Sequence, residues 1–350
     1  MRVAIIGAGV MGTSVALALA DRGIRSIVLE RAVPGAEASS AAAGILGAQI
    51  ECDEAGPHFD ELRAARDGFA ELAARLRSET SIDVGYKKCG VLAVAFDLST
   101  EERLRARVAW QRAKGCRAVW LDPTEARALE PELAENLLGA AHFEDDAQVE
   151  PPMLLRAFVS AMHARTEVEI RSGVLVRGLD IVSGVCTGVS TDEGLVSADA
   201  VVLAAGSWSE LVPGYPVAVG EVKPVRGQLA ELDERPPRLR SIVFGAGGYL
   251  VPRWDGRVVC GATSEHVGFR REVTAGGVHA VLQTAIRLAP RLASAQLNRT
   301  WSNFRPWAKA PIVGASPLPG LYMATGHHRN GILLCARTGA AVAAAIAGSA

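Results

Sequence analysis

The sequence predicts an α/β protein, α+β overall. Three separate segments of the chain contribute strands to one parallel sheet, and the segments between them form a β-rich domain. Three observations support this prediction. An apolar strand, a glycine turn and an apolar helix occupy residues 3–20. A continuous apolar strand ending in glycine follows at 198–206, and a strand, a glycine loop and a helix return at 321–341. Buried apolar strands that alternate with helices are typical of parallel sheets.

The first thirty residues have the form of a dinucleotide-binding unit, so the first domain is predicted to be Rossmann-like. The strand Val3–Ile6 runs into Gly7-Ala8-Gly9-Val10-Met11-Gly12. An apolar helix follows, and the second strand, Ile27–Leu29, ends at Glu30. A lone glycine motif is weak evidence, but here the strands, the helix and the acid all agree with it.

Each residue type in this unit has a physical role. Gly7 permits the tight turn, Gly9 lets a pyrophosphate approach the backbone, and Gly12 lets the helix pack closely on the strand. The helix N-terminus offers free N–H donors and the positive end of its dipole to phosphates. Glu30 is placed to accept hydrogen bonds from an adenosine ribose, which argues against NADP and its 2′-phosphate.

The composition is that of a globular protein with no general attraction to polyanions. Hydrophobic residues make up 49% and charged residues 21% of the 350-residue chain, and the formal net charge is −1. Nucleic acids and anionic membranes are therefore not expected partners. The apolar run at 338–347 is too short to span a bilayer, and the first strand begins too early to leave room for a secretory signal.

The cysteines and histidines do not predict a metal site. No Cys-x-x-Cys pair occurs, and the seven histidines have no metal-ligand spacing. We expect neither a disulfide framework nor bound metal, but buried thiols in a reducing cytoplasm. The six cysteines are Cys52, Cys89, Cys116, Cys186, Cys260 and Cys335.

The stretch that follows the first unit predicts a loop, a helix and a strand. Small residues at 38–48 suit a helix start and a loop that let a flat ligand approach the backbone. His58–Thr80 has apolar residues at helical spacing, which predicts one amphipathic helix. Tyr86–Phe96 alternates as a strand does.

Three further helices have recognisable starts. Ser99 and Glu102 have the spacing of a capping box, which predicts Ser99 as the N-cap of a charged helix. Asp122-Pro123-Thr124-Glu125 begins a short helix that Pro131 stops, and two prolines precede a helix at 153–165.

The second half of the chain is rich in short strands, with one helix at 274–288. The expected strands lie near 167–179, 185–190, 198–205, 221–231, 241–244, 249–252, 257–261 and 296–305.

These stretches resemble the D-amino acid oxidase family of FAD-dependent oxidoreductases, and most closely its glycine oxidase branch. The similarity runs from Val3 to about Ala341. The stretches that carry it are Ser40-Ala41-Ala42-Ala43-Gly44-Ile45-Leu46-Gly47-Ala48, Asp145-Asp146…Val149-Glu150-Pro151, Tyr249-Leu250-Val251-Pro252-Arg253, Gly261-Ala262-Thr263, Phe304-Arg305-Pro306 and Gly326-His327-His328-Arg329-Asn330-Gly331-Ile332-Leu333-Leu334.

The resemblance implies FAD, bound without a covalent link. Sarcosine oxidase relatives attach flavin to a cysteine, and none lies between Trp307 and Tyr322 here. The resemblance also implies that the C-terminal glycine loop caps the flavin ring and that the following helix start faces the flavin C2 carbonyl. The residues expected to bind FAD are Gly7, Gly9, Val10, Met11, Gly12, Glu30, Arg31, Ala38, Ser39, Ser40, Ala43, Gly44, Ile45, Val174, Gly206, Trp208, His327, His328, Arg329, Asn330, Gly331, Ile332 and Leu333.

On the substrate side, the resemblance assigns the α-carboxylate to Arg305, assisted by Tyr249 and Arg329. A planar guanidinium matches a carboxylate and stays charged when desolvated. The residues alone leave two alternatives open: Arg305 in a structural ion pair and Tyr249 as a strand core residue. No general base is nominated, because the lone pair of a neutral amine can assist loss of the α-hydride. A packing or hydrogen-bonding role is expected for His327 and His328.

Two departures from the resembled branch concern the substrate pocket. Gly247-Gly248 stands where relatives carry bulkier polar side chains, and Ser264 where a methionine is usual. We expect both changes to touch the pocket and enlarge it, which weakens a strict preference for glycine.

The predicted function is oxidative deamination of glycine or a similar small amino acid to a 2-oxo acid such as glyoxylate, ammonia and hydrogen peroxide, with molecular oxygen as acceptor. The resemblance connects this activity with thiamine biosynthesis and with a homotetramer. One alternative is a D-amino acid or sarcosine oxidase or dehydrogenase of the same fold with another acceptor. NAD-dependent dehydrogenases and non-catalytic flavin-binding subunits are the alternatives from other classes.

The three segments that contribute strands to the parallel sheet predict the domain boundaries. Residues 1–82, 146–215 and 308–350 are expected to form the FAD-binding domain, and residues 83–145 and 216–307 the substrate-binding domain.

Overall fold

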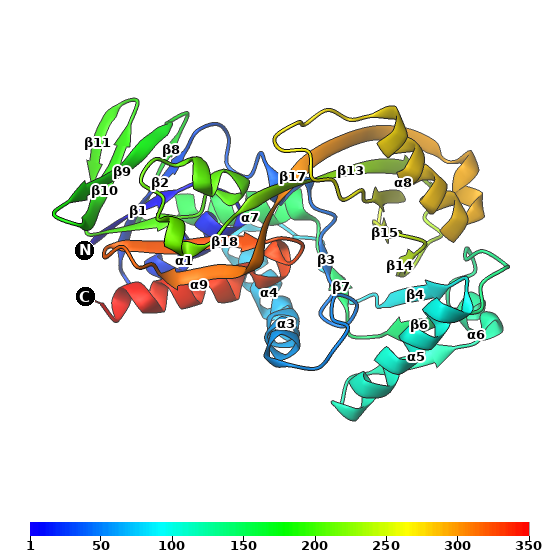
Figure 1. The fold of residues 1–350 in the computed structure, drawn as a ribbon. Coiled ribbons are helices and arrows are strands. Elements are labelled where there is room, and N and C mark those ends of the chain that lie inside the picture. The colour runs from blue at the N-terminus through cyan, green and yellow to red at the C-terminus, as the bar shows by residue number, and fades with distance from the viewer. Residues whose placement is uncertain (350) are drawn as a thin grey trace.

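The computed structural model describes residues 1–349, with only the backbone at position 219, and it confirms the predicted mixed α/β fold (Figure 1). One sheet of thirteen strands runs through the molecule in the order β5-β6-β4-β14-β15-β16-β13-β17-β18-β12-β1-β2-β8. One end of this sheet is parallel and the other mainly antiparallel.

The parallel end is the predicted dinucleotide-binding unit. Its strands are β8 (Val168–Ser172), β2 (Arg25–Glu30), β1 (Arg2–Ile6), β12 (Ala200–Leu203) and β18 (Leu321–His327), and these five run parallel to one another. Alternate residues of β1 bury on opposite faces, Val3 and Ile5 towards the helices and Ala4 and Ile6 towards a small second sheet.

The helices on one face are α1 (Val10–Ala20), α7 (Pro151–His163) and α9 (Gly331–Ala347), and the second sheet is β11 (Gly194–Ser197), β10 (Val185–Thr191) and β9 (Val176–Val182).

The other end of the sheet bears the β-rich part of the chain. Its strands are β17 (Gln296–Ala315), β13 (Lys223–Asp233), β16 (Arg257–Gly261), β15 (Gly248–Pro252), β14 (Ile242–Gly245), β4 (Val91–Ala95), β6 (Gly139–Phe143) and β5 (Ala118–Leu121). Its helices are α8 (Ala275–Leu288), α5 (Leu98–Ala113) and α6 (Pro123–Leu129).

The strand β17 is longer than predicted and joins the two ends. It pairs with β13 over Gln296–Trp307 and with β18 from Trp307 to Ala315. The predicted boundary between residues 307 and 308 falls inside this strand, and the division into domains stays a prediction.

The remaining elements are α2 (Ala38–Ala41), β3 (Ile45–Leu46), α3 (Pro57–Asp67), α4 (Phe69–Thr80), β7 (Ala147–Gln148) and the 3-10 helices η1 (Gly206–Leu211), η2 (Val217–Val219) and η3 (Pro290–Ser294).

Two details of the predicted helices are wrong. The stretch 58–80 is two helices, α3 and α4, which meet at Gly68. Apolar spacing persists across this glycine, but glycine is a poor helix former and lets the chain break there. The N-cap of α5 is Asp97, not Ser99, because the Asp97 carboxylate accepts hydrogen bonds from the N–H and hydroxyl of Thr100. Ser99 therefore lies inside the first turn.

The predicted start of α6 is confirmed, and there Asp122 and Glu125 form a capping box in which each side chain accepts from the other's backbone N–H group. Thr274 caps α8 in a similar way through the N–H of Gly277. Within residues 1–349, no helix is long and apolar enough to cross a bilayer, and all six cysteines are free.

The close approach of α1 and α9 gives a first prediction. A Cβ added at Gly339 would lie 2.6–2.8 Å from the side chain and backbone of Ser14, whose hydroxyl donates to the carbonyl of Cys335. We expect Gly339→Ala to lower the free energy of unfolding by about 1–3 kcal/mol, measured by urea denaturation. Gly276→Ala is the control, because a Cβ there meets nothing within 4 Å. Equal loss in both variants would contradict the close packing.

Candidate active site

A cavity of about 900 Å³ lies between the parallel and antiparallel ends of the sheet. Its walls include nearly all residues that the sequence predicted for cofactor and substrate. The predicted residues that line it are Gly7, Gly9, Val10, Met11, Glu30, Arg31, Ala38, Ser39, Ala43, Gly44, Ile45, Val174, Gly206, Trp208, Tyr249, Arg305, His327, His328, Arg329, Asn330, Gly331 and Ile332. Gly12, Ser40 and Leu333 do not line it.

The first wall is the glycine turn that precedes α1. Gly7 has φ +97°, and a Cβ there would lie 2.7 Å from the carbonyl oxygen of Ala204 on the neighbouring chain segment. A Cβ at Gly12 would lie 1.9 Å from the Gly7 carbonyl oxygen, so Gly12 serves packing behind the wall. At Gly9 a Cβ would touch only the Ser39 hydroxyl, which leaves the backbone open to a ligand.

The Glu30 carboxylate is fixed by backbone N–H groups. Its two oxygens accept from Ala8 at 2.9 Å and from Ala32 at 3.0 Å. The side chain is 9% exposed and lines the cavity, so its orientation is set before a ribose binds. The Ser39 hydroxyl accepts from the N–H of Val10 in the same way, at 2.9 Å.

The small-residue loop at 41–45 is held from the antiparallel side. Arg253, which directly follows β15, donates to the Ala43 carbonyl at 2.6 Å, to the Val149 carbonyl at 3.0 Å and to the Gln148 side chain at 2.7 Å. The indole N–H of Trp301 donates to the Ala41 carbonyl at 3.0 Å. Arg253 is 7% exposed, and burial lowers its pKa to about 10, so it stays charged at neutral pH.

A second helix start reaches the cavity at α9. Its N-cap, Asn330, makes no side-chain capping bond, so the N–H groups of the first turn have no side-chain partner. The N-cap of α1, Gly9, makes no side-chain capping bond either, although the Ser39 hydroxyl already accepts from the N–H of Val10. Two uncapped helix starts on one cavity supply hydrogen-bond donors at two separate places, as a dinucleotide with phosphate and ring-carbonyl oxygens requires.

The two histidines before α9 are neutral at pH 7. Burial lowers the pKa of His327 to about 4, and burial together with Arg329 and Arg305 lowers that of His328 to about 4. One ring nitrogen of His327 contacts the Thr338 hydroxyl at 2.9 Å. Within the described chain, the other ring nitrogen and Nε2 of His328 have no partner, and both residues line the cavity. They are available to a bound ligand.

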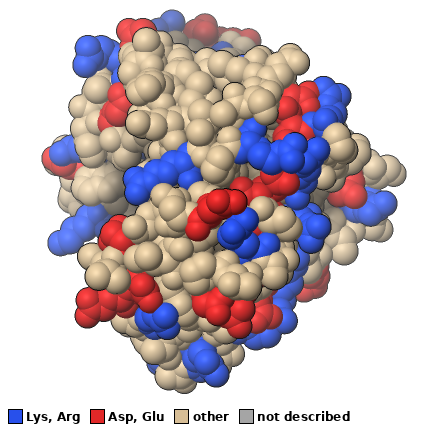
Figure 2. Space-filling view, turned by 90° about the vertical axis from the view of Figure 1, so that its right-hand side faces the viewer, with Lys and Arg blue, Asp and Glu red and all other residues tan. Residues whose placement is uncertain are grey.

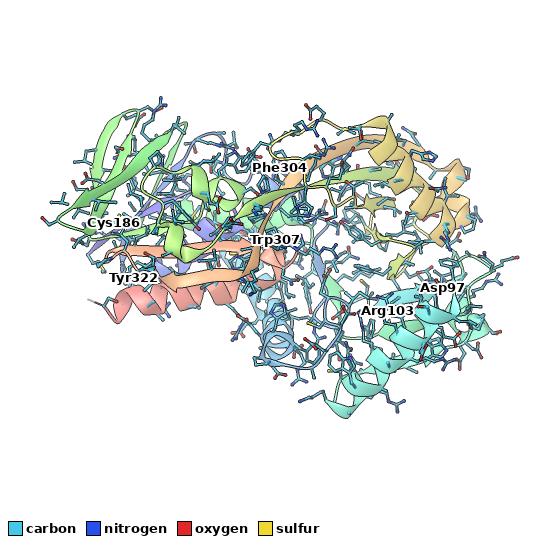
Figure 3. The ribbon with its side chains drawn as sticks, viewed as in Figure 1. Asp97, Arg103, Cys186, Phe304, Trp307 and Tyr322 are labelled. Carbon is cyan, nitrogen blue, oxygen red and sulfur yellow. The ribbon has the colours of Figure 1, made fainter. Side chains whose placement is uncertain are left out.

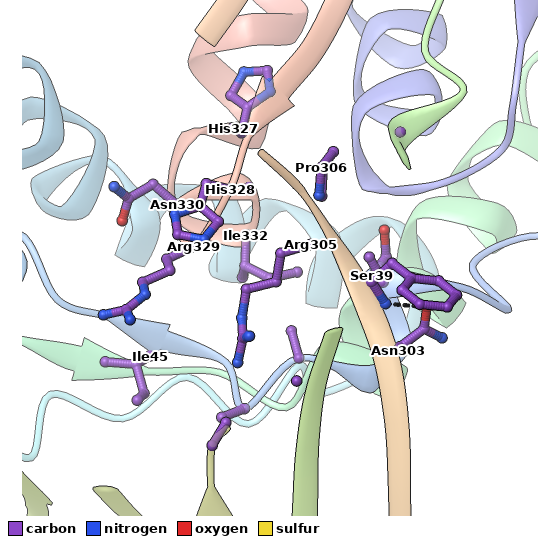
Figure 4. A pocket seen from close by; sticks show the side chains of 18 of the residues that line it. Ser39, Ile45, Asn303, Arg305, Pro306, His327, His328, Arg329, Asn330 and Ile332 are labelled. Atoms are coloured by element: carbon purple, nitrogen blue, oxygen red, sulfur yellow. Dashed lines mark hydrogen bonds between the residues drawn. The ribbon is translucent and has the colours of Figure 1, made fainter. Parts of the chain in front are cut away.

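Arg305 and Tyr249 meet at the antiparallel side of the cavity. The guanidinium of Arg305 donates to the Thr263 carbonyl at 3.1 Å, and Figure 4 shows it pointing into the same space as Arg329. Gly227 makes room for it, because a Cβ there would lie 2.4 Å from Nη1 of Arg305. Burial raises the pKa of Tyr249 while Arg305 opposes that rise, so the phenol is protonated at neutral pH.

Glu51 is a cavity residue that the sequence reasoning missed. Its carboxylate lies 3.9 Å from the guanidinium of Arg329, and burial raises its pKa against the opposing effects of Arg329, Arg305 and Arg107. Its loop is anchored by the buried Asp146, which accepts from the N–H groups of Gln49 and Ile50. No motif or spacing marks Glu51.

The prediction that Ser264 touches the substrate pocket is wrong. Ser264 is exposed and does not line the cavity, because it follows β16 beyond the point where that strand passes Tyr249. Gly247 and Gly248 do line it. Among residues 1–349 no group of three or more His, Cys, Asp or Glu side chains could hold a metal ion.

A family model described as FAD dependent oxidoreductase matches residues 2–345. The chain belongs to this family. FAD is therefore its cofactor, as predicted, and the uncapped helix starts, the open Gly9 backbone and the unpartnered histidine nitrogens suit that molecule.

Three relatives show how far the similarity extends. The chain is 36% identical over 347 residues to the bifunctional protein ThiO/ThiG of Trichormus variabilis, covering 97% of this chain and 52% of that protein. It is 36% identical to the glycine oxidase of Geobacillus kaustophilus, covering 97% of this chain and 91% of the enzyme. The crystal structure of that oxidase superposes with a TM-score of 0.93 over 99% of this chain and 95% of the oxidase, at 34% identity.

The third relative is the iminodiacetate oxidase of Chelativorans sp. BNC1, with a TM-score of 0.87 and 28% identity over 99% of this chain and 95% of that structure. The chain spans about half the length of the bifunctional relatives it matches.

The contacts of Arg253 give a second prediction. Arg253→Leu removes the donors of three buried acceptors and releases the loop at 41–45. We expect the Kd for FAD to rise at least tenfold, measured by fluorescence titration of the deflavinated protein. Arg240→Gln, on an exposed side chain outside the cavity, should leave the Kd unchanged. An unaltered Kd in Arg253→Leu would show that this loop does not contribute to FAD binding.

Proposed function

We propose that this protein is an FAD-dependent oxidase that deaminates glycine or a similarly small amino acid to a 2-oxo acid, ammonia and hydrogen peroxide. The observation that carries the proposal is the placement of Arg305. Within the described chain its guanidinium donates to a backbone carbonyl and interacts with the Tyr249 phenol, and it forms no ion pair with a carboxylate. It lies beside Tyr249 in a cavity built for FAD.

Arg305 binds the substrate carboxylate in this proposal. A guanidinium inside a cavity gains most from a carboxylate that matches its planar fork. Gly227 leaves the space that this side chain fills, and the Thr263 carbonyl fixes one of its nitrogens. The protonated phenol of Tyr249 supplies a further donor to the same carboxylate.

The bound FAD supplies a two-electron acceptor that molecular oxygen reoxidises. The chain supplies orientation and a restricted environment. Arg305 and Tyr249 fix one end of the substrate, and the N–H groups at the start of α9 stabilise negative charge on the opposite side of the cavity. No side chain is assigned as general base, because His327 and His328 are packed neutral groups and Glu51 lies beside Arg329.

The relatives support this reaction class. The glycine oxidases share this chain's full length, and the name ThiO/ThiG connects a similar chain with thiamine biosynthesis, which we propose as the pathway. The roles of the individual site residues, the cytoplasmic location and the homotetramer stay predictions.

N-substituted glycines are a second candidate class. Gly247 has φ +88°, and a Cβ there would meet nothing within 4 Å, so the cavity wall near Tyr249 leaves room for a substituent. The name of the iminodiacetate oxidase relative agrees with such substrates. A peroxide-coupled screen of glycine, sarcosine and small D-amino acids separates these classes.

Replacement of Arg305 tests the substrate assignment. We expect Arg305→Ala to lower kcat/KM for glycine by two to three decades, because a desolvated carboxylate loses a partner worth roughly 3–5 kcal/mol. The flavin absorbance spectrum should persist. Arg291→Gln is the matched control, since that exposed arginine lies outside the cavity beside Glu132. Near-normal kcat/KM in Arg305→Ala would refute the proposed carboxylate site.

A further inference from the structure

The guanidinium of Arg305 is held by a residue that lies outside the cavity lining. Nη1 of Arg305 donates to the Thr263 carbonyl at 3.1 Å, and Thr263 follows Ala262, the last residue of this segment that lines the cavity. Figure 3 shows Phe304 and Trp307, on either side of Arg305 in the sequence, in the stretch of β17 that links the two ends of the sheet. The orientation of the guanidinium therefore depends on where the Thr263 carbonyl is placed.

Thr263 belongs to the loop 262–274, which connects β16 with α8. Connections of this length without secondary structure of their own are uncommon and usually functional. Two residues beyond Thr263, Glu265 exchanges two backbone hydrogen bonds with Arg226 of β13, each at 2.9 Å. The guanidinium of Arg226 also donates to the carbonyls of Arg270 and Glu272, at 3.1 and 2.9 Å. One buried arginine thus ties down both halves of the loop.

The Glu265 carboxylate connects the loop to the strand. Oε1 accepts from the Thr263 hydroxyl at 2.5 Å and from the Gln228 side chain at 2.7 Å, and Oε2 accepts from the guanidinium of Arg226. Burial alone would raise the pKa of Glu265, but these hydrogen bonds and the charge of Arg226 lower it to about 2. Arg226 is 5% exposed and Gln228 is fully buried, so the partners of the carboxylate are fixed on the strand.

Both polar groups that precede the Thr263 carbonyl are engaged. The hydroxyl donates to Glu265 and accepts from the backbone N–H of Gln228 at 2.9 Å, and the Thr263 N–H donates to the Gln228 carbonyl at 3.3 Å. Glu265 and β13 therefore set the direction of the carbonyl before a substrate enters.

The strand β13 separates these contacts from the cavity. Gly227 and Leu229 line the cavity, whereas Arg226 and Gln228 do not, as the alternation of side chains along a strand requires. A Cβ at Gly227 would lie 2.4 Å from Nη1 of Arg305. The guanidinium thus lies over a glycine on one face of β13, while Thr263 links it to residues of the other face.

Surface charge does not replace a fixed guanidinium. Basic and acidic side chains are interspersed on the face shown in Figure 2, and the formal net charge is −1. A small carboxylate gains no strong general attraction from such a charge distribution. Its affinity depends instead on the geometry of the guanidinium inside the cavity.

We infer that Glu265 is a positioning residue that orients the substrate-binding guanidinium of Arg305 through Thr263. This inference rests on the proposed function, because Arg305 must hold the substrate carboxylate. The fixed Thr263 carbonyl takes one N–H of the planar fork and leaves the others to Tyr249 and to a carboxylate. A donor that is already oriented loses less conformational freedom when the carboxylate binds.

Binding of acetate to the FAD-loaded protein tests this role without turnover. Acetamide has nearly the same shape and no charge, so the ratio of the two Kd values, read from the flavin absorbance spectrum, measures the preference for a carboxylate. We expect this preference to fall about three- to tenfold in Thr263→Val, which lacks the hydroxyl. It should fall about threefold in Glu265→Gln, where one acceptor oxygen becomes a donor. Thr263→Ser keeps the hydroxyl and should retain the preference.

Two controls on the same loop distinguish positioning from general loosening. Glu272→Gln also removes a carboxylate beside Arg226, at 3.6 Å, but from the exposed side of the loop. Ser264→Ala changes the exposed residue between Thr263 and Glu265. Both should keep the preference for acetate, and the Kd for FAD should stay unchanged in all variants. In turnover, Thr263→Val and Glu265→Gln should raise KM for glycine by the factor lost in acetate preference, with kcat changed less than twofold.

Three outcomes would overturn the positioning role: an unchanged acetate preference in Thr263→Val and Glu265→Gln, equal losses in Thr263→Ser and Thr263→Val, or equal losses in the controls. The proposed function is judged separately by peroxide release. If no amino acid is oxidised but the acetate preference depends on Arg305, Thr263 and Glu265, the positioning role stands and the oxidase assignment fails. If glycine is oxidised and only Arg305→Ala abolishes the preference, the reverse holds.

Discussion

The double pairing of β17 determines where a substrate can meet the cofactor. Up to Trp307 this strand pairs with β13 in the antiparallel sheet, and from Trp307 onward it pairs with β18 of the parallel sheet. Arg305 stands two residues before this change of partner. The hydrogen bond from the His328 N–H to the Pro306 carbonyl, at 2.9 Å, ties the start of α9 to the same point. Backbone pairing therefore fixes the guanidinium relative to the helix start.

The same sheet also supports the loop on the cofactor side. Tyr249 is the second residue of β15, and Arg253 directly follows its last residue, Pro252. The same short segment therefore presents a phenol to the substrate end and a guanidinium to the loop at 41–45. A shift of this strand would move both groups together. Because Arg253 is buried and bonded to backbone carbonyls, such a shift would leave a charge without partners, which opposes it.

The sequence revealed the features that depend on neighbours along the chain. The glycine turn, Glu30 and the α6 capping box are local patterns whose partners lie within about twenty-five residues. Arg253 and Ala43 are 210 positions apart, and Gln49 and Asp146 are 97 apart, so no spacing could reveal those contacts. Resemblance to a family supplied Arg305 and Tyr249, whereas Glu51 became visible only when the fold brought it to the cavity. Two helix predictions were wrong for local reasons. Asp97 and Ser99 are both suitable N-cap residues, and Gly68 interrupts a stretch whose apolar spacing is continuous.

The two ends of the cavity recognise negative charge by different means. At α1 the donors are backbone N–H groups, which add no net charge and suit a cofactor that stays bound. At Arg305 the donors belong to a guanidinium group, which attracts a small anion over a longer range. The carboxylate of Glu51 lies beside Arg329 and partly offsets its positive charge. Arg305 has no such carboxylate partner in the described chain.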